Sequence, residues 1–211
     1  MKQAENREFR RQSLLSAAMA TVARFDIQGA TVARICDEAG ASRGLIAHYF
    51  DSKESLLLAA LENWFHQALE VKVAIAKDDS LMAEQKIRAI SLSSFQAPVY
   101  SWENAAAWQA FTNASRHHQS YAKAIRSASE NVRKIMEKLF RQAEKEAGIK
   151  VDPEFSAKAI YALEDGLYNS LATGKDDFSI QDARCACELF IDGFFNSNRR
   201  LPNLLTVTER G

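Results

Sequence analysis

The sequence predicts an all-α protein of about nine helices, with a small N-terminal unit of three helices followed by a larger helical unit. Apolar residues recur at spacings of three and four along most of the 211 residues, and no stretch alternates apolar and polar residues as a strand does. Only eight glycines and three prolines interrupt this pattern. Hydrophobic residues make up 47% and charged residues 26%, which is typical of a globular chain with a well-buried core.

The first three predicted helices are close together. An amphipathic helix spans about residues 5–27, and Gly29 ends it. Thr31 caps a second helix, after which Gly40 supplies the backbone freedom for a sharp corner. Ser42 caps a third helix of about two turns. Because a helix this short is not stable alone, its neighbours must hold it while its exposed side chains meet a partner.

Six further helices follow, and most begin and end at recognisable signals. Residues 152–154 (Asp-Pro-Glu) combine a capping side chain, a proline at the first helical position and an acid in the first turn. Gly148 and Gly174 end helices, and Ser179 begins the last one. The predicted ranges are about 53–77, 81–95, 102–115, 119–147, 153–173 and 179–197.

The ends of the chain carry no recognisable targeting signal. The N-terminal segment lacks the apolar region of a secretory signal, and no apolar run approaches membrane-spanning length. We therefore expect a cytoplasmic protein with no membrane partner. The predicted domains are residues 1–52 and 53–200, and residues 201–211 are expected to form a flexible tail.

The corner between the second and third helices is typical of a helix-turn-helix unit that reads DNA. If Ile46 and Phe50 face the core, the outer face of the third helix is left to other residues. These are Arg43, Gly44, Ala47 and His48. Arg43 is the best candidate for reading a base, because its guanidinium can bond both O6 and N7 of guanine. Gly44 allows a close approach to the groove, and the hydroxyls of Thr31 and Ser42 can donate to phosphates at helix starts.

The charge of this region does not by itself indicate a nucleic-acid partner. The formal net charge is +0, and the first 60 residues hold eight basic and seven acidic residues. Attraction to DNA must therefore come from locally placed side chains rather than from a bulk field. We expect weak non-specific binding.

The segment from Thr31 to Leu57, TVARICDEAGASRGLIAHYFDSKESLL, resembles the DNA-binding motif of the TetR-type repressors. The motif belongs to roughly the first quarter of the chain and is specific, because many positions must agree in order. It implies a repressor, not an enzyme, that binds a palindromic DNA operator as a homodimer. It also implies that His48 and Tyr49 contact the DNA backbone and that Lys53 binds a phosphate.

The last two predicted helices carry surface that suits a dimer interface. In the first of them, Ala162, Gly166 and Ser170 recur every four residues and form a strip of small side chains. The other has a broad apolar stripe that consists of Ile180, Ala183, Cys187, Phe190, Ile191 and Phe194. The two helices either build half of a four-helix bundle with a second copy or bury these stripes inside one chain.

Aromatic residues gather in the middle of the chain and near an acid. Trp64, Trp102 and Trp108 lie in this region. Tyr161, Asp165 and Tyr168 share one face of a later helix. Aromatic faces with a buried carboxylate suit a desolvated organic cation, although the same spacing also suits an ordinary core.

The segments around residues 107–111 and 162–168 are similar to those of the choline-responsive, BetI-type repressors of glycine-betaine synthesis. This resemblance implies that a small organic cation such as choline is the effector, with no cofactor and no metal. The ligand-binding residues that we expect are Trp102, Trp108, Phe111, Asp165 and Tyr168. The helix over about 53–77 would carry movement from the ligand to the DNA-reading unit.

Other interpretations stay open. A TetR-type regulator of a different ligand, either apolar or a cationic drug-like compound, fits the same pattern. A thiol redox sensor is also compatible, because Cys36 lies inside the DNA-reading unit, whereas Cys185 and Cys187 are expected to be reduced thiols. An enzyme is disfavoured, since no nucleophile elbow, phosphate loop or metal-ligand spacing is present in the sequence.

Overall fold

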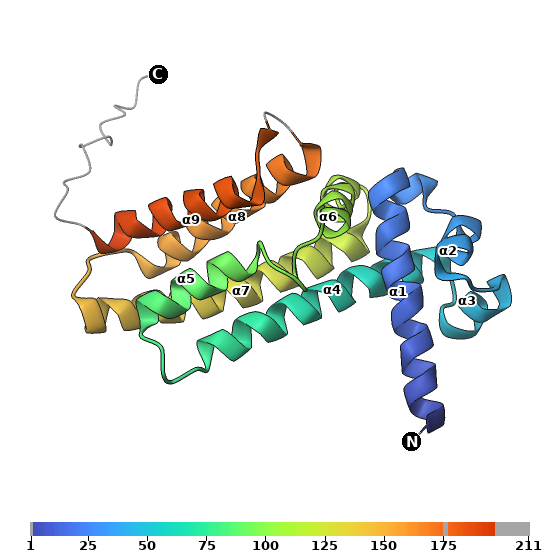
Figure 1. Ribbon diagram of the computed structural model, residues 1–211, viewed down its shortest axis with the longest axis horizontal. Helices are drawn as coiled ribbons and strands as arrows, with labels where there is room; N and C mark the ends of the chain where they lie inside the picture. The colour runs from blue at the N-terminus through green and yellow to red at the C-terminus, as the bar shows by residue number, and fades with distance from the viewer. Residues whose placement is uncertain (1, 175–176, 197–211) are drawn as a thin grey trace.

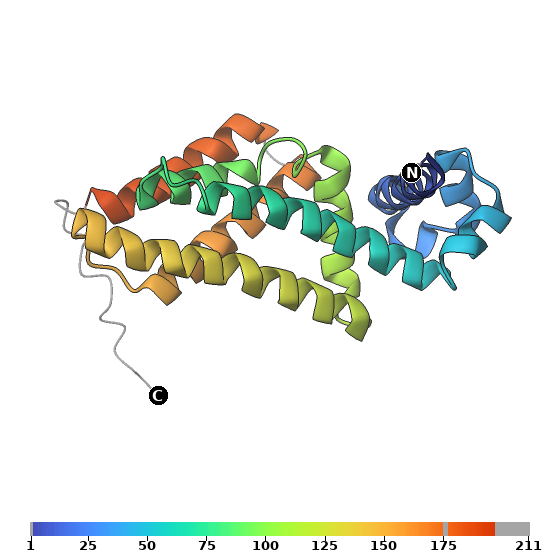
Figure 2. The same ribbon diagram turned by 90° about the horizontal axis from the view of Figure 1, so that it is seen from below.

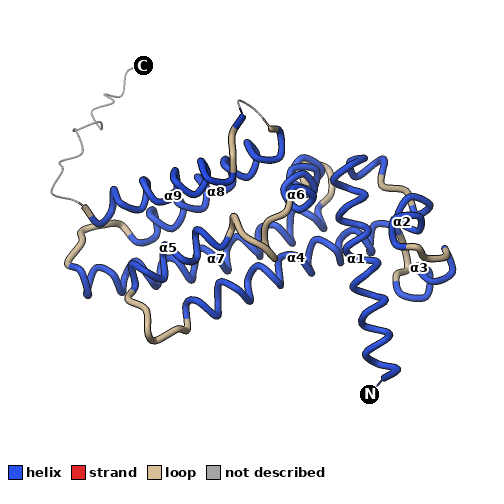
Figure 3. The backbone as a smooth tube through the Cα atoms, in the orientation of Figure 1, coloured by secondary structure: helices blue, strands red, loops and turns tan. Residues whose placement is uncertain are grey.

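The computed structural model describes residues 2–174 and 177–196, and within these ranges it contains helices, loops and turns but no strand (Figure 1, Figure 3). The described helices are α1 (Lys2–Gly29), α2 (Val32–Ala39), α3 (Arg43–Tyr49), α4 (Lys53–Ala76), α5 (Ala83–Ser93), α6 (Trp102–Ala114), α7 (Gln119–Ala147), α8 (Pro153–Thr173) and α9 (Ile180–Phe195). The prediction of an all-α chain of about nine helices is confirmed. Among these helices, none is long and apolar enough to cross a membrane. The predicted tail, residues 201–211, lies outside the described residues.

Side-chain caps explain why the predicted helix ends agree with the structure. Thr31 accepts a hydrogen bond from the backbone N–H of Arg34 at the start of α2, and Ser42 accepts one from Leu45 at the start of α3. Gly40 adopts the left-handed conformation at the corner between them, with φ of 60°. The local chemistry of the segment therefore builds the predicted helix-turn-helix corner.

The first helix is longer and less regular than predicted. It begins at Lys2 rather than near residue 5, and its backbone leaves helical geometry at Asp26, where φ is 61° and ψ is 173°. The carboxylate of Asp26 accepts a hydrogen bond from the N–H of Ile27 at 2.6 Å. This contact stabilises the break in the helix. The helix then ends at Gly29, and this end agrees with the prediction.

The helices form a small N-terminal unit at one end of an elongated body (Figure 1, Figure 2). α1, α2 and α3 make the unit, and α4 runs from it into the body beside α7. One hydrophobic cluster joins the unit to α4, α6 and α8, whereas a second lies at the far end among α5, α7, α8 and α9. α1 also packs on α6, so α4 and α6 both connect the unit to the body.

Half of the apolar stripe of α9 is buried inside the chain. Ala183, Cys187 and Ile191 are fully buried, because α9 lays this face against α5 and α8. This part of the stripe belongs to the core of one chain, whereas Ile180 stays exposed and Phe190 and Phe194 are half-buried. The exposed small and apolar residues of α8 and α9 include Ala162, Gly166, Ile180, Cys185, Leu189 and Gly193.

Candidate functional site

The outer face of α3 is arranged as the sequence predicts. Ile46 and Phe50 are buried in the core of the N-terminal unit. The predicted outer residues Arg43, Gly44, Ala47 and His48 are all exposed. Within the described chain, the Arg43 guanidinium makes no hydrogen bond or ion pair, so all of its donors can reach an external acceptor.

The other predicted DNA-binding residues already have partners inside the unit. The Tyr49 hydroxyl donates to the backbone carbonyl of Arg7 at 3.2 Å, and Lys53 Nζ donates to the carbonyl of Ile27 at 3.0 Å. These bonds tie α3 and the start of α4 to α1. An ammonium has three N–H donors, so Lys53 retains two for a phosphate. Thr31 and Ser42 use only acceptor capacity in capping, which leaves their O–H groups to donate.

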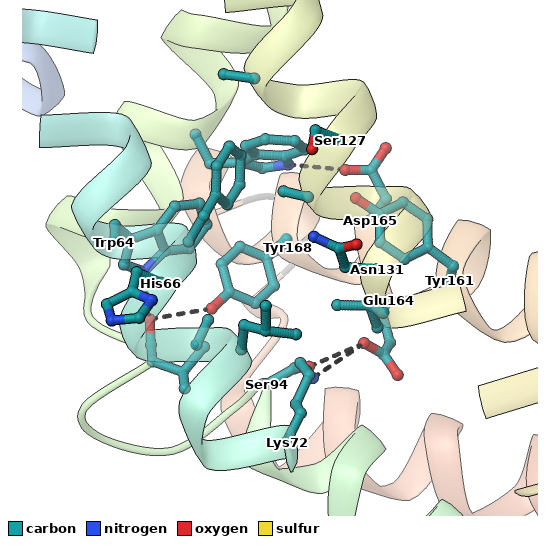
Figure 4. A pocket seen from close by; sticks show the side chains of 18 of the residues that line it. Trp64, His66, Lys72, Ser94, Ser127, Asn131, Tyr161, Glu164, Asp165 and Tyr168 are labelled. Atoms are coloured by element: carbon teal, nitrogen blue, oxygen red, sulfur yellow. Dashed lines mark hydrogen bonds and ion pairs between the residues drawn. The ribbon is translucent and has the colours of Figure 1, made fainter. Parts of the chain in front are cut away.

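A cavity of about 290 Å³ lies in the body between α4, α6, α7 and α8 (Figure 4). Its volume is at the small end of the range of about 300–1,000 Å³ that is usual for ligand sites. The aromatic wall of the cavity consists of Trp64, Phe65, Trp108, Tyr161 and Tyr168. Polar and charged side chains also reach it, which gives the cavity the mixed lining of a small-molecule site.

One backbone carbonyl holds two rings of the aromatic wall. Trp64 Nε1 donates to the carbonyl of Val99 at 3.0 Å, and the Tyr168 hydroxyl donates to the same oxygen at 3.3 Å. The ring centroid of Trp64 lies 5.9 Å from that of Trp108 and 6.3 Å from that of Tyr168. Hydrogen bonds and ring contacts therefore fix the rings before any ligand arrives.

Asp165 reaches the cavity, but it is not the buried acid that we expected. Trp108 Nε1 donates to its Oδ1 at 2.7 Å, which fixes the carboxylate beside the aromatic wall. Asp165 itself is exposed, whereas the neighbouring Glu164 is only 9% exposed. The buried carboxylate of the cavity is therefore that of Glu164, and Figure 4 shows it near Ser94 and Lys72, apart from the carboxylate of Asp165.

Glu164 belongs to a buried polar chain. Lys72 Nζ donates to Ser94 Oγ at 2.7 Å, and Ser94 Oγ donates to Glu164 Oε2 at 2.8 Å. Lys72 Nζ also donates to the carbonyl of Ile90 at 3.1 Å and lies 4.0 Å from Glu164 Oε2. Burial raises the pKa of Glu164 and lowers the pKa of Lys72, and in each case the partner's charge opposes the shift. No pattern in the sequence indicated that these residues pair.

Two predicted ligand-binding residues lie outside the cavity lining. Trp102 is 48% exposed at the first turn of α6. Trp108 follows it by about one and two-thirds turns, which places the two side chains about 120° apart around the helix axis. Phe111 is fully buried and packs edge-to-face on Tyr121, with ring centroids 5.1 Å apart. Trp102 is therefore a surface residue and Phe111 a core residue, whereas Trp108, Asp165 and Tyr168 do line the cavity.

An exposed short helix that follows a tight corner, joined to a helical body with a cavity, is typical of a helix-turn-helix transcriptional regulator. Residues 14–60 match the family of bacterial regulatory proteins of the tetR type, and residues 83–196 match the C-terminal domain of BetI-type transcriptional repressors. The chain belongs to the TetR family, with a BetI-type C-terminal domain. It is thus a transcriptional regulator and not an enzyme.

Full-length relatives agree with this assignment. The regulator BetI of Proteus mirabilis is 31% identical over 188 residues, which cover 87% of this chain and 90% of the relative. A transcriptional regulator of Pseudomonas aeruginosa has a solved structure with a TM-score of 0.76 and 27% identity, covering 90% of this chain and 92% of that one. A Saccharomonospora viridis regulator solved in complex with choline shares the fold, with a TM-score of 0.77, 22% identity and coverage of 86% and 95%.

Proposed function

We propose that this regulator binds a palindromic DNA operator as a homodimer and that a small organic cation such as choline modulates its binding. One observation carries the proposal. A single helix, α4, begins at Lys53, shortly after α3 ends at Tyr49, and also contributes Trp64 and Phe65 to the aromatic wall. The DNA-reading unit and the cavity therefore share a structural element through which an effector can act.

The outer face of α3 supports reading of the major groove. Arg43 has all its donors available for guanine, while Gly44 and Ala47 are too small to keep the helix out of the groove. His48 lies beside them and is exposed, so it can donate to a phosphate. Thr31, Ser42, Tyr49 and Lys53 complete the proposed DNA-binding set around this face.

The exposed strip of α8 supports the homodimer. Ala162 and Gly166 are exposed, and a Cβ added at Gly166 would meet no atom within 4 Å inside the protomer. Such a strip allows the helix of a second copy to approach closely, and the exposed Leu189 of α9 adds apolar area. A twofold dimer would present two α3 helices to two half-sites of an operator.

The cavity supports a small cation as the effector. Aromatic faces attract a cation through their quadrupoles, and the fixed carboxylate of Asp165 adds opposite charge. The Lys72–Glu164 pair presents both a donor and an acceptor, which suits a hydroxyl such as that of choline. A quaternary ammonium makes no ordinary hydrogen bond, so the rings and the carboxylate must provide its binding energy.

The alternatives have less support. A cavity of about 290 Å³ favours a small effector over a drug-sized one, although a different small ligand would fit the same walls. Cys36 is only 7% exposed and lies in the hydrophobic core of the N-terminal unit. Burial restricts the access of oxidants to its thiol, which disfavours a redox sensor at this position.

Three measurements test the proposal. Selection of duplexes from a randomised library with the full-length protein should yield a palindrome, and choline should change the affinity for that duplex in a mobility-shift titration. Isothermal calorimetry should then show heat on addition of choline. Glycine betaine serves as the comparison ligand, because it keeps the trimethylammonium group but carries a carboxylate in place of the hydroxymethyl group. If millimolar choline produced no heat and no thermal shift, the effector assignment would be overturned. If the selection recovered no palindrome, the operator assignment would be overturned.

A further inference from the structure

The N-terminal turns of α1 carry a row of arginines beside α3. Among the first twelve residues, four are basic and two are acidic, whereas residues 13–60 hold four basic and five acidic residues. The positive charge of the N-terminal unit is therefore concentrated at the start of α1. Figure 1 shows that this part of α1 extends past α2 and α3.

Most of the other basic residues of the unit are already engaged inside it. Arg24 forms an ion pair with Glu38 at 2.7 Å. Arg34 donates to the carbonyl of Gly29 at 2.8 Å, and its guanidinium carbon lies 4.1 Å from the ring centroid of Phe25. Lys53 is bonded to a backbone carbonyl of α1. Residues 13–60 thus leave Arg43 as the basic side chain with no partner in the described chain.

The arginines of α1 share one face, and that face touches the end of α3. At about 100° per residue, Arg7, Arg10 and Arg11 fall within an arc of roughly 100°, while Glu5 and Glu8 fall outside it. The guanidinium carbon of Arg7 lies 5.9 Å from the ring centroid of Tyr49. That of Arg11 lies 5.9 Å from the ring of Phe50, the residue that ends α3, although Arg11 also approaches Glu8 at 4.0 Å.

We propose that this arginine face, defined as Arg7, Arg10 and Arg11, is a second DNA-binding surface that binds backbone phosphates next to the bases read by α3. The guanidinium fork matches the geometry of phosphate oxygens, and the rings of Tyr49 and Phe50 restrict the motion of two of the three side chains. Arg7 and Arg10 are exposed. The face supplies the local positive charge that a unit of nearly balanced composition needs to hold DNA.

The position of α1 also indicates which phosphates the arginine face binds. The N-terminus of α1 and the helices α8 and α9 lie on opposite sides of the molecule (Figure 1). In a dimer built through α8, the two arginine faces therefore lie far from the twofold axis, beyond the outer ends of the half-sites. The segment from residue 2 to residue 11 is about 14 Å long, which corresponds to about four base pairs of DNA. The surface should bind the flanks of the operator.

The test rests on the proposed operator binding and compares two lengths of the selected duplex. One duplex ends at the palindrome, and the other extends it by about six base pairs on each side. Wild-type protein should bind the longer duplex about tenfold more tightly at low salt, whereas Arg7→Gln/Arg10→Gln should bind both lengths equally. For the longer duplex, the logarithm of the binding constant falls linearly with the logarithm of the salt concentration. In the variant the magnitude of this slope should decrease by about 0.9 for each phosphate that the replaced arginines no longer neutralise, summed over both protomers.

Two further variants separate charge from structure. Arg126→Gln removes an exposed arginine of α7 and should behave as wild type. Arg7→Lys/Arg10→Lys keeps the charge and should retain most of the length dependence. Wild-type protein that binds the palindrome with equal affinity at both lengths would overturn the arginine face but leave the operator proposal standing. A selection that recovers no palindromic duplex would overturn both.

Discussion

Replacement of Lys72 by methionine tests whether the buried polar chain beside the cavity stabilises the fold. Methionine keeps much of the apolar stem of Lys72 but removes the ammonium, which donates to the carbonyl of Ile90 and to Ser94 Oγ. Glu164 then loses the cation that lies 4.0 Å from its carboxylate. The variant therefore leaves an acid in a site built for an ion pair.

The expected loss is large. Removal of one partner of a buried pair costs about 3–5 kcal/mol, because the remaining charge stays poorly solvated. For a chain of this size, about 1 kcal/mol corresponds to roughly 2–4 °C in Tm, so Lys72→Met should melt about 6–20 °C below wild type near neutral pH. Lys123→Met, at an exposed lysine of α7, should change stability by less than about 0.5 kcal/mol and serves as the control.

The loss should depend on pH in a defined direction. Burial already raises the pKa of Glu164, and removal of Lys72 takes away a charge that lowers it. An acid whose pKa is higher in the folded state than in the unfolded state holds its proton better when folded. The variant should therefore become less stable as the pH rises above about 4.3, the usual pKa of a glutamate side chain.

The measurement is the Tm of thermal unfolding, monitored by circular dichroism at one protein concentration. It compares wild type, Lys72→Met, Glu164→Gln and the double variant at pH 5 and pH 8. The double variant should recover much of the stability lost by Lys72→Met, because no unpaired charge remains. Equal melting of Lys72→Met and wild type at both pH values, or simple addition of the two single losses, would refute the reasoning.

Three further predictions concern DNA, the dimer and the effector. Arg43→Ala should abolish sequence preference, a loss of about 1–3 kcal/mol in discrimination between duplexes, while Lys53→Ala should weaken binding to all duplexes alike. If both variants bound a cognate operator as wild type does in a mobility-shift titration, other residues would have to bind the DNA. Gly166→Trp should convert the proposed dimer to a monomer in sedimentation analysis. The variant should keep its helicity, because the protomer has room at this position. A dimer that persists would place the interface on another face. Trp108→Phe keeps a ring but loses the bond to Asp165, and should weaken choline binding by about 2- to 30-fold in calorimetry; unaltered affinity would remove Trp108 from the site.

Helix ends could be predicted from the sequence because they depend on chemistry within a few residues. Asp152 accepts hydrogen bonds from the N–H groups of Glu154 and Phe155 at the start of α8, as its spacing predicted. Gly148 and Gly174 adopt left-handed φ angles of 65° and 59° at the ends of α7 and α8. The break at Asp26 was missed, since a non-glycine residue with positive φ leaves no reliable sequence signal.

The cavity could be predicted only in part, because periodicity identifies a face but not the helix that covers it. The sequence placed Tyr161, Asp165 and Tyr168 on one face of α8, and all three line the cavity. Glu164 lies only about 100° from Asp165 around the same helix, yet it is buried because α4 supplies Lys72 on that side. Such a pair joins residues that are 92 positions apart, so no local pattern reveals it.

The connections between the cavity and the DNA-reading unit limit how an effector can act. Trp64 of α4 and Trp108 of α6 belong to the aromatic wall, and the same two helices support the unit, α4 through Lys53 and α6 through its packing on α1. A ligand that changes the spacing of these two rings therefore changes both supports together. The ligand can change the free energy of operator binding by at most the difference between its own binding free energies for the two spacings of the rings. Such coupling free energies are typically about 1–3 kcal/mol. If choline is the effector, as we propose, linkage requires operator DNA to change the affinity for choline by the same factor. Calorimetry with and without the selected duplex then measures the same coupling as a mobility-shift titration with and without choline.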